Sequence, residues 1–495
     1  MDRSPIQGGA VIRADAISSP MLTTALTIAE IVLIALLVPW IALEKRPPMA
    51  TLAWIFLVLA LPFAGPVVYY LIGHRRVKKG RFKRLRAKLG LRHARDRLHH
   101  APTSSERERH DEGTRQLMRL GTEACASPPS TARSLRFFFE GDEAFDAIEE
   151  AVRGAKHHVH LEYYIFEPDL TGTRLRDLLV DRARAGVEVR LLVDAVGSHR
   201  LDHRFLAPLR EAGAMVAAFA PARRMLRRPR HVNFRNHRKI VVVDGDIGFT
   251  GGVNITDDES ERASGPHAYR DTHLRFEGDA VRWLQLVFLE DWSYAVGSAP
   301  TDAAYFPPAT GAGSHSAQIL ASGPDEPWQA IQKLYFSAIT SARHRVLVTT
   351  PYFVPDEPML TALTTAALRG VDVRVLVPRR SDSRTVTAAA RSFFGELCEA
   401  GVRIYEYTPR MLHAKTLVVD EGFAAVGTAN MDSRSFHLNY EVIAALYGPE
   451  APRELASAFA RDLERSREVT QGELANDRLW RRIGEAGARL LAPVL

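Results

Sequence analysis

The sequence predicts an α/β protein built from two similar halves and preceded by a two-helix transmembrane hairpin. Three observations predict this fold: two long apolar runs near the N-terminus, an alternation of strand and helix patterns after them, and a second half that repeats the order of the first. The 495 residues exceed a single domain of roughly 100–200 residues. With 46% hydrophobic and 25% charged residues, the composition excludes a wholly disordered or collagen-like chain.

The hairpin is predicted over residues 1–73. Its apolar runs cover about residues 21–43, with the single charge Glu30, and about residues 51–72, with no charge. Each run is near the roughly 20 residues that a helix needs to cross a bilayer's hydrocarbon core. A cleaved signal peptide is the alternative for the first run, but residues 1–20 carry no net positive charge and the run is long. Two buried core helices are the remaining alternative.

A strongly basic segment follows the hairpin. Residues 75–97 hold twelve Lys and Arg and one acid, Asp96, so this segment carries +11 and the rest of the chain sums to 7 − 11 = −4. Because cytoplasmic flanks of membrane helices collect Lys and Arg, the N-terminus and the long C-terminal part are expected in the cytoplasm. The cations are also suited to anionic lipid headgroups or to a solvated helix face. Residues 74–134 are therefore predicted to be a basic juxtamembrane segment and a polar linker with at most a short helix.

Two cysteines, Cys125 and Cys398, cannot build a disulfide framework or a multi-cysteine zinc site, and they fit a reducing compartment. After the linker, the chain predicts a first half over residues 135–298, a linker over 299–316 and a second half over 317–470. Each half shows a helix, a strand, a second helix and a second strand, which indicates an α/β sheet.

One chemical motif occurs in both halves. Each copy consists of His-x-Lys, a run of four mostly apolar residues, Asp, six further residues and a Gly-x-x-Asn. The residues concerned are His237, Lys239, Asp244 and Asn254 in the first copy, and His413, Lys415, Asp420 and Asn430 in the second. On a strand, residues two apart share a face, so the His and Lys of each copy are expected to point the same way. A single copy is typical of a surface strand, but two copies at matching points of an internal repeat favour a catalytic site.

These groups suit attack on a phosphodiester. A neutral imidazole is a competent nucleophile near pH 7, and a second imidazole can protonate the leaving alkoxide. Two lysines and two asparagine amides can hold the phosphate oxygens as charge builds in the transition state. This chemistry requires no metal and no cofactor, and the sequence lacks His-Glu-x-x-His, Cys-x-x-Cys and phosphate-loop patterns.

The duplicated His-x-Lys-x4-Asp closely resembles the signature of the phospholipase D superfamily, and within it the chain is similar to the bacterial cardiolipin synthases. The resemblance runs from about Ala42 to the C-terminus. It is carried by Arg46-Pro47-Pro48, Trp54 and residues 69–73, 234–239, 270–274, 351–355, 427–436 and 439–441.

The resemblance implies two halves packed face to face, with both motifs at one active site. It also implies that one phosphatidylglycerol gives its phosphatidyl group to a histidine and releases glycerol, after which a second phosphatidylglycerol attacks and yields cardiolipin. By analogy, His237 is the nucleophile and His413 the acid and then the base, with the reverse assignment left open. Asp271 and Glu441 match the carboxylates that orient the histidines.

Several further expectations accompany the resemblance. Asp244 and Asp420 complete the signature but are expected nearer to structural roles at the strand ends. The chain departs from the family in residues 257–262, where a Tyr is usual, and at Tyr269, which stands where the family usually has Trp. Because of these departures, the resemblance does not predict the loop at the rim of the active site.

Two segments have alternative interpretations. Residues 222–235 form an arginine-rich insert that either clamps anionic lipid or is a solvated loop; its arginines are Arg223, Arg224, Arg227, Arg228, Arg230 and Arg235. Residues 471–495 are expected to form a C-terminal amphipathic helix that either lies in the membrane interface or docks on the catalytic part.

Two other functions share these motifs. A membrane-bound hydrolase of the same fold would pass the phosphatidyl group to water and release phosphatidic acid. A membrane-tethered nuclease is disfavoured because the hairpin confines the site to the bilayer surface. The expected partners are therefore phosphatidylglycerol and anionic membrane lipid, not nucleic acid, in a multi-pass protein of the bacterial inner membrane.

Overall fold

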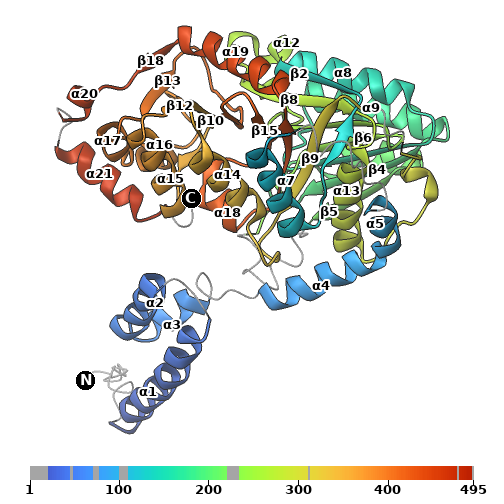
Figure 1. The fold of residues 1–495 in the computed structure, drawn as a ribbon. Helices are drawn as coiled ribbons and strands as arrows, with labels where there is room; N and C mark the ends of the chain where they lie inside the picture. The colour runs from blue at the N-terminus through green and yellow to red at the C-terminus, as the bar shows by residue number, and fades with distance from the viewer. Residues whose placement is uncertain are drawn as a thin grey trace, which may run out of the picture. The chain divides into compact units, whose positions relative to one another are not determined.

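The computed structural model describes residues 20–44, 48–70, 77–99, 110–219, 234–309, 313–475 and 479–492. The chain forms two compact units, Met1–Arg76 and Val77–Leu495. We describe each unit by itself (Figure 1).

The described residues of the first unit form the helices α1 (Pro20–Ala42), α2 (Pro48–Ala60) and the short α3 (Ala64–Val68). Among the described residues, one helix is long and apolar enough to cross a membrane, over Thr24–Ala42 of α1. The helices pack on one another through a small cluster that includes Ile41 and Val58, and the rings of Trp54 and Tyr69 meet edge to face. The first predicted span is therefore helical.

The second predicted span, residues 51–72, is not a single helix. Helix α2 has 13 residues, which at 1.5 Å per residue is about 20 Å and short of a hydrocarbon core of about 30 Å. Pro62 and Phe63 interrupt the run, since Pro62 has no N–H to donate and Phe63 adopts a φ of 56°. Gly65 then allows α3 to approach α2, because a Cβ there would lie 2.4 Å from the carbonyl oxygen of Leu57. Counting apolar residues missed this break because the interruption is itself apolar.

The described part of the second unit contains two large β-sheets with the same strand order and a two-stranded sheet of β11 (Phe353–Val354) and β16 (Met431–Asp432). In the first half the order is β2-β8-β7-β6-β3-β4-β5, and in the second it is β9-β17-β15-β14-β10-β12-β13, with β1 and β18 added at the two edges. The strands of the first sheet are β2 (Ser134–Glu140), β3 (His158–Tyr163), β4 (Glu188–Asp194), β5 (Met215–Phe219), β6 (Ile240–Val243), β7 (Ile247–Gly251) and β8 (Arg270–Glu277). Those of the second are β1 (Ser130–Ala132), β9 (His315–Ser322), β10 (Arg345–Thr349), β12 (Asp372–Pro378), β13 (Arg403–Tyr407), β14 (Thr416–Val419), β15 (Phe423–Gly427), β17 (Glu441–Tyr447) and β18 (Ser466–Glu468). The repeat predicted from the sequence is thus present as two α/β halves.

Alternate residues of the central strands feed two different cores. In β6, Ile240 and Val242 join the core shared by both halves, whereas Val241 and Val243 join the core under the outer helices of the first half. The outer helices are α8 (Gly141–Gly154), α9 (Leu170–Arg184) and α10 (His203–Glu211) in the first half, and α14 (Ala330–Ser341), α15 (Glu357–Leu368), α16 (Arg384–Arg391) and α17 (Phe394–Glu399) in the second. The shared core also holds residues of α13 (Val281–Val296) and α19 (Glu450–Glu464), so the halves pack face to face.

The predicted linker before the first half is part of the second half. Helix α7 (Glu112–Cys125) has 14 residues, with Leu117 and Met118 buried, and it packs on α14. Strand β1 then pairs antiparallel with β9 at the edge of the second sheet. The expectation of at most a short helix here was wrong, because the buried stripe of α7 is narrow and its other positions are polar.

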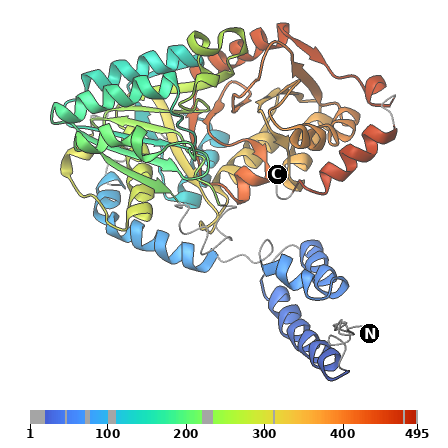
Figure 2. The same cartoon turned by 180° about the vertical axis from the view of Figure 1, so that it is seen from behind.

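The basic segment also belongs to the second unit. Helices α4 (Val77–Gly90) and α5 (Arg92–His99) lie along α13, as both ribbon views show (Figures 1 and 2). Three of its cations form ion pairs with carboxylates of this unit: Arg84 with Asp291, Lys88 with Glu326, and Arg95 with Glu290. The positive charge of residues 75–97 is therefore partly used to dock these helices.

The C-terminal segment forms α20 (Gln471–Ala475) and α21 (Leu479–Arg489). Helix α21 packs on α16, where Arg391 Nε lies 3.0 Å from the Glu485 carboxylate. Of the two alternatives, docking on the rest of the unit is the one observed. Leu479 and Trp480 nevertheless remain exposed on the outer face of the helix.

Candidate active site

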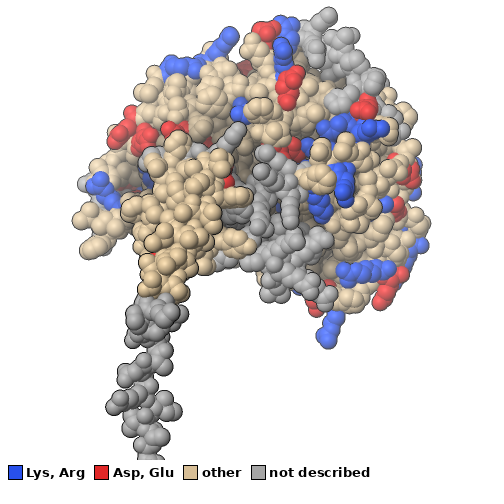
Figure 3. Space-filling model, turned by 90° about the horizontal axis from the view of Figure 1, so that it is seen from below, with Lys and Arg blue, Asp and Glu red and all other residues tan. Residues whose placement is uncertain are grey.

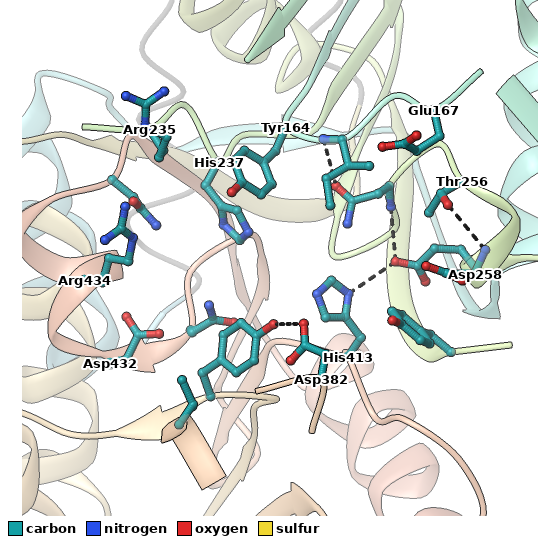
Figure 4. A pocket seen from close by; sticks show the side chains of 18 of the residues that line it. Tyr164, Glu167, Arg235, His237, Thr256, Asp258, Asp382, His413, Asp432 and Arg434 are labelled. Carbon is teal, nitrogen blue, oxygen red and sulfur yellow. Dashed lines mark hydrogen bonds and ion pairs between the residues drawn. The ribbon is translucent and has the colours of Figure 1, made fainter. Parts of the chain in front are cut away.

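The two His-x-Lys motifs meet at one cavity. His237 and His413 both line a cavity of about 530 Å³ (Figure 4). The sequence pattern placed the histidines on strands, but β6 begins at Ile240 and β14 at Thr416, so each histidine lies in the extended segment that leads into its strand. Each lead-in segment makes a single β-bridge, and that bridge joins it to the other half. The lead-in segments therefore bring the two motifs together.

Each half supplies the carboxylate that holds the other half's histidine. His237 Nδ1 lies 3.0 Å from an oxygen of Glu441, and His413 Nδ1 lies 2.6 Å from an oxygen of Asp271. The backbone N–H of each histidine donates to the carbonyl of the residue before that carboxylate, at 2.9 Å for His237 and 2.7 Å for His413. Because Nδ1 is occupied in both rings, Nε2 is the nitrogen left to act on a ligand.

A second carboxylate on His413 was missed from the sequence. Glu259 Oε1 lies 3.3 Å from His413 Nδ1, and the same oxygen accepts from the backbone N–H of Asn254 at 3.4 Å. At the equivalent offset in the second half stands Ser435, whose hydroxyl accepts from the N–H of Asn430 at 3.1 Å. Glu259 belongs to residues 257–262, the stretch in which the chain departs from the family. Its position five residues after Asn254 was the available signal.

The pKa values of the two imidazoles are shifted in opposite directions, and the carboxylates around the two rings differ in number. Burial lowers the pKa of His237 to about 4, and Glu441 opposes this effect only in part. Burial also acts against the charge on His413, but Asp271 and Glu259 together raise the pKa of His413 above its ordinary value. The two pKa shifts therefore run in opposite directions, which disfavours a proton on His237 and favours one on His413.

The motif lysines lie fully buried beside the histidines. Lys239 Nζ donates to the carbonyl of His237 at 2.9 Å, and Lys415 Nζ donates to that of His413. Burial and the neighbouring Lys415 lower the pKa of Lys239 to about 7. An anion bound close to the two lysines would favour the charged form of both.

Asn254 and Asn430 both line the cavity. The side-chain oxygen of Asn254 accepts from the N–H of Ile165 at 3.3 Å, which fixes the orientation of the amide. The rest of the wall mixes arginines and carboxylates: Arg200, Arg235 and Arg434, with Glu167, Asp258, Glu259, Asp382 and Asp432. Of the arginine-rich insert, Arg235 is described, and it lies 3.4 Å from Asp194. The other arginines of the insert lie outside the described residues.

Two tyrosines accompany the histidines. Tyr164 meets His237 edge to face with ring centroids 4.9 Å apart, and Tyr269 lies beside His413 with centroids 5.7 Å apart. Tyr269 thus keeps an aromatic ring at the position where the family usually has Trp. Tyr164 follows β3 directly and lies outside the His-x-Lys motif, so the motif did not identify it as a site residue.

The motif aspartates do not line the cavity. Asp244 accepts three backbone N–H groups, from Lys156, His157 and His158, at 2.8 to 2.9 Å. Asp420 accepts the three equivalent ones of the second half, from Arg343, His344 and Arg345, at 2.8 to 2.9 Å. Both aspartates adopt the left-handed conformation, with φ of 54° and 52°, which Asp tolerates better than most residues. They tie the turn after the motif strand to the start of the neighbouring strand.

Asp244→Ala should lower the free energy of unfolding by about 2–4 kcal/mol, because it leaves three charge-assisted hydrogen bonds unmade. Turnover per folded molecule should change little. Denaturant unfolding and turnover of the same preparations check this. Asp246→Ala, two residues away and exposed, is the matched control and should shift stability by under about 0.5 kcal/mol. Loss of turnover in a fully stable Asp244→Ala would instead assign Asp244 to the chemistry.

One group of described residues has its donor atoms close enough to share a metal ion: Glu259, Asp271 and His413. The same atoms are joined by the hydrogen bonds described above, and His413 Nδ1 contacts both carboxylates. This arrangement accounts for the donor set as a histidine held between two carboxylates.

The repeated strand order and the paired His-x-Lys sites define a phospholipase D-type enzyme. A family model described as cardiolipin synthase, PLD-like domain, matches residues 148–264 and 335–463, and one described as phospholipase D-nuclease N-terminal matches residues 31–74. Cardiolipin synthase 2 of Bacillus anthracis is 42% identical over 92% of this chain and 88% of its own length, and cardiolipin synthase of Halalkalibacterium halodurans is 40% identical over 92% and 91%. The chain belongs to the bacterial cardiolipin synthases of the phospholipase D superfamily, which are phosphatidyltransferases.

Among solved structures, phosphatidylserine synthase of Haemophilus influenzae has a TM-score of 0.59 at 14% identity, covering 77% of this chain and 100% of that one. At this identity the similarity shows a common fold.

Proposed function

We propose that this enzyme joins two phosphatidylglycerol molecules into cardiolipin and glycerol through a phosphatidyl-histidine on His237. The observation that carries this assignment is the unequal set of carboxylates on the two imidazoles in one cavity: one on His237, Glu441, and two on His413, Asp271 and Glu259. A nucleophile must be unprotonated and a general acid protonated at the same pH, and the lowered pKa of His237 and the raised pKa of His413 support this order.

In the first step, Nε2 of His237 attacks the phosphorus of one phosphatidylglycerol. The bond between phosphorus and the glycerol oxygen breaks, and His413 gives its proton to that oxygen, so glycerol leaves. In the second step, His413 takes the proton from the terminal hydroxyl of a second phosphatidylglycerol as its oxygen attacks phosphorus. The P–N bond breaks, cardiolipin forms and His237 is restored.

The remaining groups of the site stabilise the phosphate. Lys239 and Lys415 supply positive charge, and the amides of Asn254 and Asn430 supply hydrogen-bond donors for the oxygens on which charge builds. All four are buried, so these groups act in a medium of low dielectric. The lowered pKa of Lys239 should rise again when the anionic phosphate binds.

Phosphatidylglycerol alone should suffice as substrate, because exchange of one phosphodiester for another is nearly balanced in free energy. Purified enzyme in phosphatidylglycerol vesicles without CDP-diacylglycerol should release glycerol and cardiolipin in equal amounts, measured by lipid mass spectrometry and glycerol assay. His237→Ala under the same conditions is the control. Phosphatidic acid without cardiolipin would assign the hydrolase alternative, and cleavage of DNA by the same preparation would assign the nuclease.

We also infer that the protein is multi-pass, with its second unit on the cytoplasmic side of the bacterial inner membrane. Helix α2 alone is too short to cross the membrane, and the packing of α1 on α2 and α3 supports a hairpin in which α2 and α3 together return the chain to the side on which it began. The cations of residues 75–97 support that side being cytoplasmic. Seen from below, the face crossed by α4 carries Lys and Arg side chains interspersed with acidic ones (Figure 3).

A further inference from the structure

A buried arginine of α4 lies behind His237. The Arg84 side chain is 3% exposed and forms an ion pair with Asp291 of α13. Its guanidinium carbon also lies 5.1 Å from the ring centroid of Tyr440. Its neighbours Leu85 and Arg86 are exposed, whereas this turn of the helix directs Arg84 inward.

The first contact leads to the backbone of Glu441, the residue whose carboxylate holds His237. Asp291 is fully buried and also forms an ion pair with Arg238, the residue directly after His237. Arg238 Nε donates to the carbonyl oxygen of Glu441 at 3.0 Å, and its Nη2 donates to that of Ser322 at 3.0 Å. One Asp291 oxygen thus meets Arg84 and the other meets Arg238.

The second contact leads to the backbone of His237. The Tyr440 carbonyl accepts the N–H of His237 at 2.9 Å, and the Tyr440 hydroxyl donates to Asp325 at 2.8 Å. The Tyr440 ring has Arg84 at 5.1 Å and Arg238 at 5.6 Å, both within cation–π range. Arg84 therefore contacts both the ion pair and the ring that fix the segment carrying Glu441.

The buried charges of this network need two cations. Despite its burial, Asp291 has a pKa lowered to about 2 because Arg238 and Arg84 both face it. Without Arg84, Arg238 would be the remaining cation of the two, while it also holds the carbonyl of Glu441. In the second half the equivalent of Arg238 is Ala414, so this arrangement stands behind His237 and not behind His413.

We propose that Arg84 is a positioning residue that holds Glu441 and His237 in their reactive geometry, so that docking of the juxtamembrane helix α4 completes the catalytic centre. The inference rests on the proposed role of His237 as nucleophile. On this proposal, the basic segment of residues 75–97 contributes to the reaction as well as to the membrane topology. A displacement of the imidazole of the order of 1 Å is enough to lower the rate of attack about a hundredfold.

The test uses the full-length enzyme in phosphatidylglycerol vesicles. Arg84→Met keeps the apolar stem and loses the charge, and we expect it to lower kcat about 10- to 100-fold with KM changed less than about twofold. Arg84→Lys should recover a substantial part of kcat, because an ammonium can still pair with Asp291. Arg86→Ala loses the same charge from the exposed side of α4 and should behave as wild type.

Arg95→Ala separates positioning from docking. Arg95 of α5 pairs with Glu290, next to Asp291 on α13, so its loss weakens the packing of the adjoining basic helix on α13 and leaves the contacts of Arg84 with Asp291 and Tyr440 in place. It should lower thermal stability and keep kcat. If Arg95→Ala and Arg84→Met lower kcat equally, or if Arg84→Met keeps wild-type kcat, the inference is overturned.

Two further variants complete the design. Should Arg84→Met not fold, Arg84→Gln removes the same charge and keeps a hydrogen-bond donor for Asp291; a lowered kcat with unchanged KM supports the inference, and wild-type kcat overturns it. His237→Ala tests the proposed function by itself. If His237→Ala stays active, the proposed function fails whatever Arg84 does.

Discussion

Alanine at His237 or at His413 should lower turnover at least about a thousandfold, but only His413→Ala should still form the covalent intermediate. Loss of the nucleophile removes the pathway itself, whereas loss of a general acid and base costs about 10²–10⁴. The acid is needed to expel a poor leaving group such as glycerol. A substrate whose leaving group needs no proton bypasses that need.

A phosphatidyl ester of p-nitrophenol supplies such a leaving group. With His413→Ala it should give a burst of about one nitrophenol per active site, followed by a very slow phase, because the base for the second step is missing. With His237→Ala it should give no burst. His203→Ala, an exposed histidine on α10, is the control and should keep full turnover. A burst from His237→Ala would reverse the assignment, and near-normal turnover of either variant would refute the two-histidine site.

The sequence was sufficient for the repeat because the repeat has a local signature. Each motif strand alternates between two buried faces, as Ile240 and Val241 show by joining different cores, and this produces a continuous apolar run bounded by polar residues. The same run occurs at Thr416–Val419, and the motif residues flank it at the same offsets. Local patterns of this kind can be recognised from the sequence alone.

The pairing of each histidine with a carboxylate from the other half has no local signature in the sequence. Asp271 lies in the first half and holds His413, 142 residues away, and Glu441 holds His237 across 204 residues. Motif spacing pairs each carboxylate with its own half, whereas face-to-face packing pairs it with the other. Glu259 was missed for a related reason, since the repeat offers Ser435 and no carboxylate at the equivalent position.

The same distinction explains the N-terminal region. An apolar run predicts burial in lipid or protein, but the geometry of residues 51–72 depends on where Pro62 interrupts the helix. Basic residues predict an anionic partner, but which of them face inward depends on the acids of α13. Arg84 and Arg86 are alike in the sequence, but in the folded protein Arg84 pairs with Asp291 whereas Arg86 is exposed to solvent.

Neutralising Asp271, the first-half carboxylate that holds His413, should move the basic limb of the pH profile of kcat to lower pH. Asp271 is the main group that raises the pKa of His413 above 6.5, so it keeps the acid protonated as the pH rises. In Asp271→Asn burial dominates, the pKa of His413 falls, and the proton is lost at lower pH. Turnover near neutrality should then fall about 10²–10⁴-fold. Initial rates from pH 5 to 9 measure both effects.

Two matched variants test whether the shift of the basic limb in Asp271→Asn arises from His413. Glu259→Gln should move the limb the same way but less, because its oxygen lies 3.3 Å from His413 Nδ1 against 2.6 Å for Asp271. Glu441→Gln acts on His237, so it should lower kcat and leave the basic limb in place. Because the three changes alter charge at one buried site, their different effects on the limb assign it to His413 rather than to the overall field. A basic limb unmoved in Asp271→Asn would show that another group, with Lys239 the first candidate, sets it.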